Sequence, residues 1–293
     1  MIRTAMIMAA GMGTRFGQYT ELIPKGFVKV GGIPMIVRSI DTLLSCGIER
    51  IVIGTGYKQE VYEELKTDYP MLETCFSPRY AETNSMYTLY NTREILGNDD
   101  FLLLESDLIF EKQAIMSLLE CPAADAMLIT PVTKFQDQYY VEHDDNFRLS
   151  SCSVNKNKLN AKGELVGIHK LSGSFYKIMC ADYASIVDEQ PNLGYEYELL
   201  RISCSQSPVY VHKVEGLKWY EIDDIQDLDI ASSMFASDDE EKLRRIQARY
   251  GGYWRYPHLL DFCYLVNPYF PSSKLMNEIK ANFEMLLTQY PSG

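Results

Sequence analysis

Short apolar runs alternate along this chain with segments whose apolar residues recur at helical spacing. Residues 34–46 and 59–69 have helical spacing, and the first of these segments stops at Gly47, a residue that commonly ends a helix. Strands that alternate with helices predict a parallel sheet covered by helices on both faces. Strands are predicted at residues 6–10, 51–53, 72–76, 101–108 and 126–132, and the apolar runs at 6–10 and 51–53 predict buried strands.

The pattern changes within residues 134–171. Short apolar segments at 139–141, 148–149 and 165–168 are separated by polar turns such as 143–146. This spacing predicts an antiparallel insertion over one side of the sheet. The expected fold class is therefore α/β, with a Rossmann-like, mostly parallel sheet flanked by helices and a small antiparallel insertion.

The first apolar run ends in a glycine-rich loop that contains Ala10, Gly11 and Gly13 and is followed by Arg15 and Lys25. Glycines let backbone N–H groups face an anion, and the two cations add positive charge. The spacing fits neither a P-loop, which needs Gly-Lys before Ser or Thr, nor the dinucleotide fingerprint, which needs a third Gly. The loop predicts phosphate binding, and a purely structural turn remains the alternative.

Composition limits the classes of protein that this chain can represent. With 293 residues and 46% hydrophobic content it can bury a sizeable core. A net charge of −12 argues against a nucleic-acid binder, although a small nucleotide can bind where a few cations and a metal ion converge. The seven cysteines form no Cys-x-x-Cys pair, which favours reduced thiols in a cytoplasmic protein. No segment is long and apolar enough to predict a membrane span.

The glycine loop, Pro24-Lys25 and Gly32-Ile33-Pro34-Met35-Ile36 together resemble the nucleotidyltransferases that activate sugar phosphates and phosphocholine. That family reads Ala-Ala-Gly-x-Gly-x-Arg, then Pro-Lys, then Gly-x-Pro-[ML]-[IV] at the start of a helix. The resemblance implies the nucleotidyltransferase fold, with Lys25 and Arg15 as catalytic cations on the phosphates. It also implies nucleotide contacts from the loop residues Ala10, Gly11 and Gly13.

Residues 80–90 are similar to the Tyr-Ala-x-x-Asn-[NS]-x-Tyr-[ST]-Leu-Tyr block of phosphocholine cytidylyltransferases. In those enzymes the block closes over the nucleotide base, which implies base contacts from Tyr80, Asn84 and Ser85. From the residues alone, an ordinary helix start is the alternative, because residues 83–85 can each cap a helix.

Carboxylates follow two predicted strands. Asp107 comes at the end of an apolar strand, and residues 219–228 resemble the family's second acidic motif. In a strand Glu221 and Asp223 point to the same face. The resemblance implies a Mg²⁺ site made of Asp107, Glu221 and Asp223, whereas Asp224 is expected to cap the following helix. Turn or edge acids without a metal are the alternative.

Four further residues are candidates for the acceptor pocket. In the related enzymes the segment that corresponds to residues 134–171 lines the acceptor pocket. Lys134 could therefore pair with a phosphonate or phosphate, and Tyr139 could lie against an alkylammonium group. Glu196 and Glu198, interleaved with tyrosines, could bind a primary ammonium. A packing tyrosine, a solvated lysine and a solvated helix face remain the alternatives.

The last residues differ from the rest and predict three parts: a nucleotidyltransferase domain at 1–232, a linker helix at 233–250 and a further domain fragment at 251–293. In the linker, acids precede bases over 237–245, as the helix dipole favours. Residues 250–271 and the ending Tyr-Pro-Ser-Gly resemble the opening of a fold-type I pyridoxal-phosphate (PLP) aminotransferase. We expect a bifunctional polypeptide in which PLP would bind only in the aminotransferase part.

The fused aminotransferase favours an amine-bearing acceptor, since transamination of phosphonoacetaldehyde yields 2-aminoethylphosphonate. The predicted reaction is Mg²⁺-dependent transfer from CTP to 2-aminoethylphosphonate, giving CMP-2-aminoethylphosphonate and pyrophosphate. The expected partners are CTP and an amino-phosphonate or phosphomonoester, without nucleic acid or membrane. A phosphocholine or sugar-phosphate nucleotidyltransferase and a non-catalytic nucleotide-binding module remain the alternatives.

Overall fold

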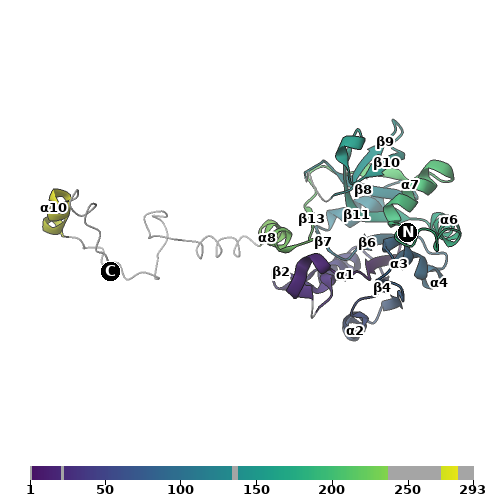
Figure 1. Ribbon diagram of the computed structural model, residues 1–293, viewed down its shortest axis with the longest axis horizontal. Coiled ribbons are helices and arrows are strands. Elements are labelled where there is room, and N and C mark those ends of the chain that lie inside the picture. The colour runs from purple at the N-terminus through teal and green to yellow at the C-terminus, as the bar shows by residue number, and fades with distance from the viewer. Residues whose placement is uncertain (1, 21–22, 134–137, 237–271, 283–293) are drawn as a thin grey trace. The chain divides into compact units, whose positions relative to one another are not determined.

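The computed structural model of the protein describes residues 2–20, 23–133, 138–236 and 272–282 (Figure 1). The chain divides into two compact units, Met1–Ala236 and Ser237–Gly293. In the second unit the structure describes the helix α10 (Ser273–Ala281), which Ser272 caps by accepting a hydrogen bond from the Leu275 N–H. Most of the predicted linker and the aminotransferase-like motifs lie outside the described residues.

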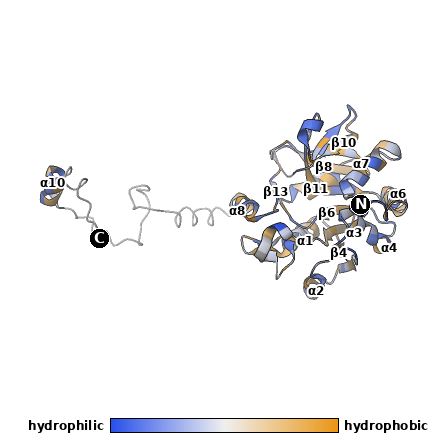
Figure 2. Cartoon of the chain, viewed as in Figure 1, coloured by the Kyte–Doolittle hydropathy of each residue, from blue (hydrophilic) through white to orange (hydrophobic). Residues whose placement is uncertain are grey.

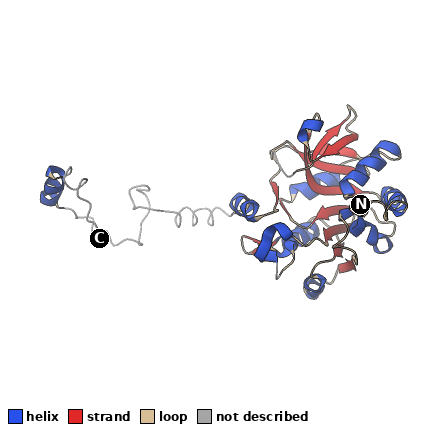
Figure 3. Cartoon of the chain, viewed as in Figure 1, coloured by secondary structure: helices blue, strands red, loops and turns tan. Residues whose placement is uncertain are grey.

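The first unit is an α/β structure in which strands occupy the centre and helices surround them (Figure 3). Within the described residues its main sheet has nine strands. Strands β6, β1, β4 and β5 are neighbours and run parallel. The bounds of the nine strands are β1 (Thr4–Ala9), β4 (Arg50–Thr55), β5 (Leu72–Phe76), β6 (Phe101–Glu105), β8 (Ala126–Thr130), β9 (Tyr140–His143), β10 (Leu149–Ser153), β11 (Gly163–Leu171) and β12 (Tyr210–Lys213).

The antiparallel part continues this sheet, whereas the sequence had predicted an insertion lying over one side of it. Strand β11 connects the two parts, because its first residues pair with β9 and its last residues pair with β6. Gly167 lies between the two pairings with φ 79°, a left-handed conformation that favours glycine. The sheet therefore forks at Gly167, beside the end of β6.

Helices pack on both faces of the sheet, and smaller two-stranded sheets complete the unit. The helices of the first unit are α1 (Met35–Ser45), α2 (Gln59–Glu64), α3 (Ser85–Asn91), α4 (Arg93–Leu96), α5 (Gln113–Glu120), α6 (Gly173–Ala184), α7 (Tyr195–Ser205) and α8 (Ile225–Met234). The short strands are β2 (Lys29–Val30), β3 (Ile33–Pro34), β7 (Leu108–Phe110) and β13 (Trp219–Glu221). The 3₁₀ turns are Thr14–Thr20, Lys25–Phe27, Leu65–Thr67 and Lys156–Lys158.

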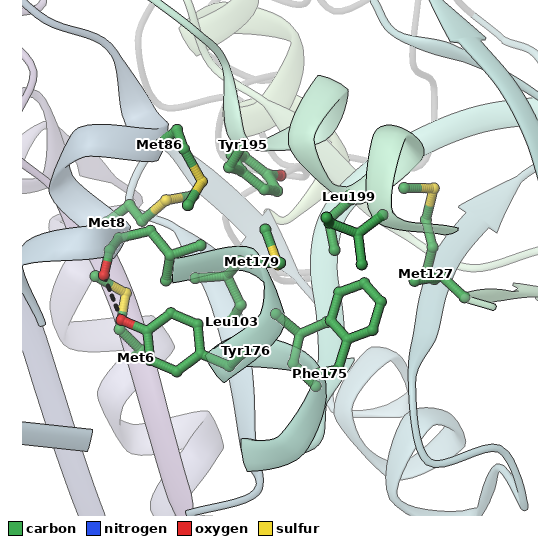
Figure 4. Packing of buried hydrophobic residues seen from close by; sticks show 14 of the residues in the cluster. Met6, Met8, Met86, Leu103, Met127, Phe175, Tyr176, Met179, Tyr195 and Leu199 are labelled. Carbon is green, nitrogen blue, oxygen red and sulfur yellow. Dashed lines mark hydrogen bonds between the residues drawn. The ribbon is translucent and has the colours of Figure 1, made fainter. Parts of the chain in front are cut away.

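The core has two layers because successive residues of a strand point to opposite faces. In β1, Met6 and Met8 pack in the cluster that contains α3, α6 and α7 residues, whereas Ala5 and Ile7 pack with α1 and α5. Figure 4 shows the first cluster, and Figure 2 shows hydrophobic colour on central strands such as β6 and β8. Each large apolar side chain buried in this way contributes about 1.5–3 kcal/mol to folding.

Several predicted boundaries can be compared directly with the structure. The predicted strand 72–76 coincides with β5, and the helix predicted at 34–46 is α1. Gly47 ends α1 with φ 89°, and the Ile48 N–H donates back to the Leu43 carbonyl at 3.1 Å. The helix predicted at 59–69 instead ends at Glu64 and continues as a 3₁₀ turn. The predicted domain boundary at residue 232 falls inside α8.

None of the helices within the described ranges has the length and apolar content that a bilayer crossing would need.

Candidate active site

A cavity of about 530 Å³ lies where β1 and β6 end, the edge at which open parallel sheets bind ligands. Most of the predicted site residues line it, although Lys134 lies outside the described residues. The predicted residues in the cavity wall are Ala10, Gly11, Gly13, Arg15, Lys25, Tyr80, Asn84, Ser85, Asp107, Tyr139, Glu196, Glu221 and Asp223.

The glycine loop forms one side of this cavity. Gly13 has φ 61°, and a Cβ there would lie 3.0 Å from the Lys25 Cβ, so glycine is required for both conformation and space. The Gly13 carbonyl accepts hydrogen bonds from the Phe16 N–H at 3.1 Å and the Thr20 hydroxyl at 2.9 Å. At Gly11 the space beside Cα is open for 4 Å. The loop is thus anchored at Gly13 and accessible at Gly11.

Lys25 joins the glycine loop to the acidic side of the cavity. Its Nζ donates to Asp107 Oδ2 at 2.5 Å and to Asp223 Oδ1 at 2.6 Å. Arg15 Nη2 donates to the same Asp223 oxygen at 2.7 Å. Burial by itself would lower the pKa of Lys25, but the two carboxylates raise it above its ordinary value. The ammonium therefore stays charged in a largely buried position.

Glu105, Asp107 and Glu221 form a carboxylate group in which one oxygen of each lies within 4.8 Å of the others. Burial, followed by the charges of Glu221, Asp107 and Glu196, raises the pKa of Glu105 well above its usual range. A divalent cation would offset this repulsion, and an all-oxygen donor set suits Mg²⁺. The residues present therefore fit the ion that the sequence resemblance implied.

The predicted ligand set differs from this group at one position. Asp223 was predicted as a ligand, but its Oδ1 accepts from both Lys25 and Arg15, while Glu105 joins Asp107 and Glu221. Metal ligation by Asp223 stays a prediction. Glu105 was not predicted from the sequence, although its place two residues before Asp107 at the end of the same predicted strand could have suggested it.

Asp224 has the structural role that the sequence predicted. Its Oδ1 accepts from the Gln226 N–H at 2.8 Å and the Asp227 N–H at 2.9 Å, so it caps α8. We expect Asp224→Ala to lower the free energy of unfolding by about 1 kcal/mol, because the capped N–H groups lose their acceptor. Urea denaturation measures this loss. Turnover should stay near the wild-type rate, and a large drop in turnover would contradict a purely structural role.

The segment predicted to contact the base begins α3 at the cavity edge. Asn84 Oδ1 accepts from the Ser85 N–H at 2.7 Å, which confirms a helix cap, and Ser85 Oγ accepts from the Tyr195 N–H at 3.0 Å. Gly56, which the sequence analysis overlooked, packs against Tyr80, since a Cβ at residue 56 would lie 2.6 Å from the Tyr80 Cβ. Base contacts by Tyr80, Asn84 and Ser85 stay predictions.

The predicted acceptor residues separate into two groups. Tyr139 and Glu196 line the cavity, and the Tyr139 ring packs edge-on against Tyr197 with centroids 5.7 Å apart. Glu196 is 6% exposed, its Oε2 has no hydrogen-bond partner among the described residues, and burial raises its pKa to about 7. Glu198 is fully buried outside the cavity lining and accepts from Arg201 Nη2 at 2.7 Å. Because both acids are buried, the solvated-face alternative is wrong.

Other cavity residues were absent from the sequence analysis. Gln138 Nε2 donates to Glu221 Oε2 at 2.9 Å, and nothing in the local sequence indicates this contact. Tyr195 donates its hydroxyl to Glu105 Oε1 at 2.6 Å. Its position beside Glu196 in the segment already singled out is the only sequence signal for it.

Relatives of this chain were identified by sequence and by structure. The CMP-5'-(3-aminopropyl)phosphonate synthase of Streptomyces rubellomurinus is 26% identical over 99% of this chain and 47% of its own length. The 2-aminoethylphosphonate cytidylyltransferase of Lancefieldella rimae is 34% identical over 38% of this chain and 45% of its own length. The chain thus spans about half the length of these curated relatives.

A solved structure shares the fold of this chain. The CTP:phosphocholine cytidylyltransferase of Streptococcus pneumoniae matches with a TM-score of 0.67 and 25% identity, over 80% of this chain and 100% of that chain. The family of MobA-like NTP transferase domains matches residues 5–182. This agreement confirms the fold class and the family predicted from the sequence, and the chain belongs to the MobA-like NTP transferase family of nucleotidyltransferases.

Proposed function

We propose that this protein is a Mg²⁺-dependent cytidylyltransferase that converts CTP and 2-aminoethylphosphonate to CMP-2-aminoethylphosphonate and pyrophosphate. The observation that carries the proposal is the position of Lys25, whose Nζ contacts Asp107 and Asp223 between the glycine loop and the carboxylate group. A site for a triphosphate needs cations, backbone donors and metal ligands together, and one cavity holds residues of all three kinds.

The chain's own residues contribute charge and position. A phosphonate oxygen of the acceptor attacks the α-phosphorus of CTP, and the bond to the departing pyrophosphate breaks in line with this attack. Lys25 binds the α-phosphate or the attacking oxygen, and Arg15, whose side chain is 61% exposed, binds the β- and γ-phosphates. Both cations neutralise charge that increases as the pyrophosphate leaves.

Mg²⁺ would be held by Asp107 and Glu221, with Glu105 as the third member of the group and Asp223 as a further candidate. Bound there, the ion would neutralise part of the negative charge of the phosphate oxygens.

An acceptor that carries an ammonium is supported by Glu196, a buried cavity-lining carboxylate with one oxygen that no described residue hydrogen-bonds. The names of two relatives, which act on aminoalkylphosphonates, agree with this chemistry. We assign Tyr139 to the same end of the acceptor and Lys134 to its phosphonate. Glu198 pairs with Arg201 within α7, and Arg201 also pairs with Asp182 of α6, so Glu198 would act only indirectly by helping to hold α7 against α6.

Phosphocholine is the second candidate acceptor. The neighbouring rings of Tyr139 and Tyr197 favour it, because aromatic faces attract quaternary ammonium groups. A primary ammonium, unlike a quaternary one, can donate N–H bonds to Glu196, and this difference is the reason for preferring the aminophosphonate.

The acceptor should bind more tightly as Glu196 ionises. Because burial raises the pKa of Glu196 to about 7, its carboxylate is mostly neutral at lower pH, whereas the acceptor ammonium stays charged. We expect the KM for the acceptor to fall about tenfold between about pH 6 and about pH 8. Steady-state kinetics at several pH values measures this change.

The matched control is Glu196→Gln. Phosphonate oxygens also titrate near neutral pH, and their effect on KM remains in the variant. The pH dependence that is present in the wild type and absent from the variant is therefore due to Glu196. Within the described part of the chain, Tyr139, Cys152, Glu105 and Tyr195 are further titratable groups that interact electrostatically with Glu196. An identical pH profile in both proteins would contradict the assignment.

The proposed reaction is tested by incubating the protein with each NTP and a panel of phosphonate and phosphomonoester acceptors, followed by mass analysis of the products. A CMP conjugate of 2-aminoethylphosphonate is the expected main product. A conjugate of phosphocholine or of a sugar phosphate instead would identify a different acceptor. Metal-dependent turnover of any of them would exclude a non-catalytic nucleotide-binding module.

We also propose that residues 251–293 begin an aminotransferase domain that binds PLP. The resemblance of residues 250–271 to the opening of such an enzyme supports this proposal. Translation of the gene beyond codon 293 tests the proposal, which requires an in-frame domain with a PLP-binding lysine.

A further inference from the structure

The two oxygens of the Glu105 carboxylate have different neighbours. Oε1 accepts the Tyr195 hydroxyl proton at 2.6 Å. Oε2 faces Gly167, where a Cβ would lie 2.8 Å from this oxygen. Only glycine at the fork of the sheet leaves the carboxylate in this place, and its left-handed φ of 79° requires the same residue.

Tyr195 contacts a second buried group. His169 Nε2 lies 2.9 Å from the Tyr195 hydroxyl, and both residues are fully buried. Burial lowers the pKa of His169 to about 3, so the ring is neutral and carries one N–H. Its Nδ1 has no hydrogen-bond partner among the described residues, which is consistent with the proton being on Nε2.

The protons in the hydrogen bonds that join His169, Tyr195 and Glu105 can be assigned to donors. When Glu105 is ionised, as it is when it binds a cation, its carboxylate can only accept, so the single proton of the Tyr195 hydroxyl is donated to it. The contact with His169 must then run from Nε2–H to the hydroxyl oxygen. Hydrogen-bond donation therefore runs in one direction, from His169 through Tyr195 to Glu105. It ends on an oxygen of the Glu105–Asp107–Glu221 carboxylate group.

The backbone of Tyr195 is fixed as well. Its N–H donates to Ser85 Oγ at 3.0 Å, which ties the first residue of α7 to the first residue of α3. The Tyr195 ring also packs edge-on against His169, with centroids 5.2 Å apart. The hydroxyl is thus held independently of any substrate.

We propose that Tyr195, with its hydroxyl oriented by His169, is a positioning residue for Glu105 and determines how tightly the Glu105–Asp107–Glu221 group binds a divalent cation. This inference rests on the proposed function, in which that group holds Mg²⁺. Groups that hydrogen-bond to a metal ligand fix its orientation, and their removal typically weakens metal affinity by about tenfold to a hundredfold.

The test is the binding of Mn²⁺, as a paramagnetic probe, to the full 293-residue chain, measured by electron paramagnetic resonance without nucleotide or acceptor. Tyr195→Phe should raise the Kd for Mn²⁺ by about tenfold or more, because it removes the hydroxyl and keeps the ring. His169→Leu should raise the Kd in the same direction. His169→Gln should keep the Kd for Mn²⁺ near the wild-type value, since an amide N–H can replace Nε2–H.

Tyr176→Phe is the matched control. Tyr176 is equally buried and belongs to the same core cluster (Figure 4), and its hydroxyl contacts Thr92 and the Leu89 carbonyl. This variant should bind Mn²⁺ like the wild type. An unchanged Kd in Tyr195→Phe, an equal weakening in Tyr176→Phe, or a wild-type chain that binds no Mn²⁺ would each overturn the inference.

Turnover provides a second measurement. In Tyr195→Phe the Mg²⁺ concentration for half-maximal rate should rise, while the KM for CTP at saturating Mg²⁺ should stay near the wild-type value. A wild-type protein that binds Mn²⁺ but turns over no acceptor would refute the proposed function and leave the role of Tyr195 in metal binding intact.

Discussion

Lys25→Ala is expected to reduce the rate of pyrophosphate release by roughly a hundredfold or more, the scale of losing one electrostatic stabiliser of a transition state. Lys25 is the cation that contacts Asp107 and Asp223, and its side chain is 13% exposed. A water molecule in place of the ammonium would have to reorient during the reaction, whereas the ammonium is already fixed in position. A coupled assay of pyrophosphate at saturating CTP and acceptor measures the effect.

Lys29→Ala is the matched control for this variant. Lys29 lies close by in sequence on β2 but is exposed, and it does not line the cavity within the described residues. It should retain turnover near the wild-type rate. A Lys25→Ala protein that releases pyrophosphate almost normally would disprove the catalytic role, provided that its circular dichroism spectrum is native.

Asp107→Ala should cause a loss of similar size, again roughly a hundredfold or more. The carboxylate belongs to the group that would hold Mg²⁺, and it also accepts a hydrogen bond from Lys25 Nζ. Its removal therefore weakens the cation site and leaves Asp223 as the carboxylate that pairs with Lys25 in the described part of the chain. The same pyrophosphate assay, repeated over a series of Mg²⁺ concentrations, measures the loss.

Asp224→Ala serves as the control for Asp107→Ala, since it removes an aspartate that caps a helix. The two variants should have opposite effects, with turnover lost in Asp107→Ala and stability lost in Asp224→Ala. A Mg²⁺ dependence in Asp107→Ala that matches the wild type would argue against a role for Asp107 in metal binding.

The parts of the fold that could be predicted are those encoded by neighbouring residues. The short segment 72–76 and the spacing of Ile36, Ile40 and Leu43 contain enough information for β5 and α1, because strand and helix periods repeat over a few residues. The fork of the sheet could not be predicted. It depends on which strands pair with each half of β11, and those partners lie far away in the sequence.

The acidic residues show the same limit. Glu196 and Glu198 are two positions apart in one motif, yet one lines the cavity and the other pairs with Arg201. On a helix such residues point in different directions, and only the packing of α7 decides which of them faces the site. Asp223 and Asp224 differ for a similar reason, since the cap is a local contact and the pair with Lys25 is not.

The sequence by itself determined the α/β fold, the glycine loop with Arg15 and Lys25, and the acids at Asp107 and Glu221. These features follow from local spacing and from motifs that resemble a known family. The tertiary structure decided which charges meet, because Lys25 and Asp223 are 198 positions apart and Tyr195 and Glu105 are 90 apart. Burial acts in the same way, since only the packed chain removes Glu105, Glu196 and His169 from water and thereby changes their pKa values.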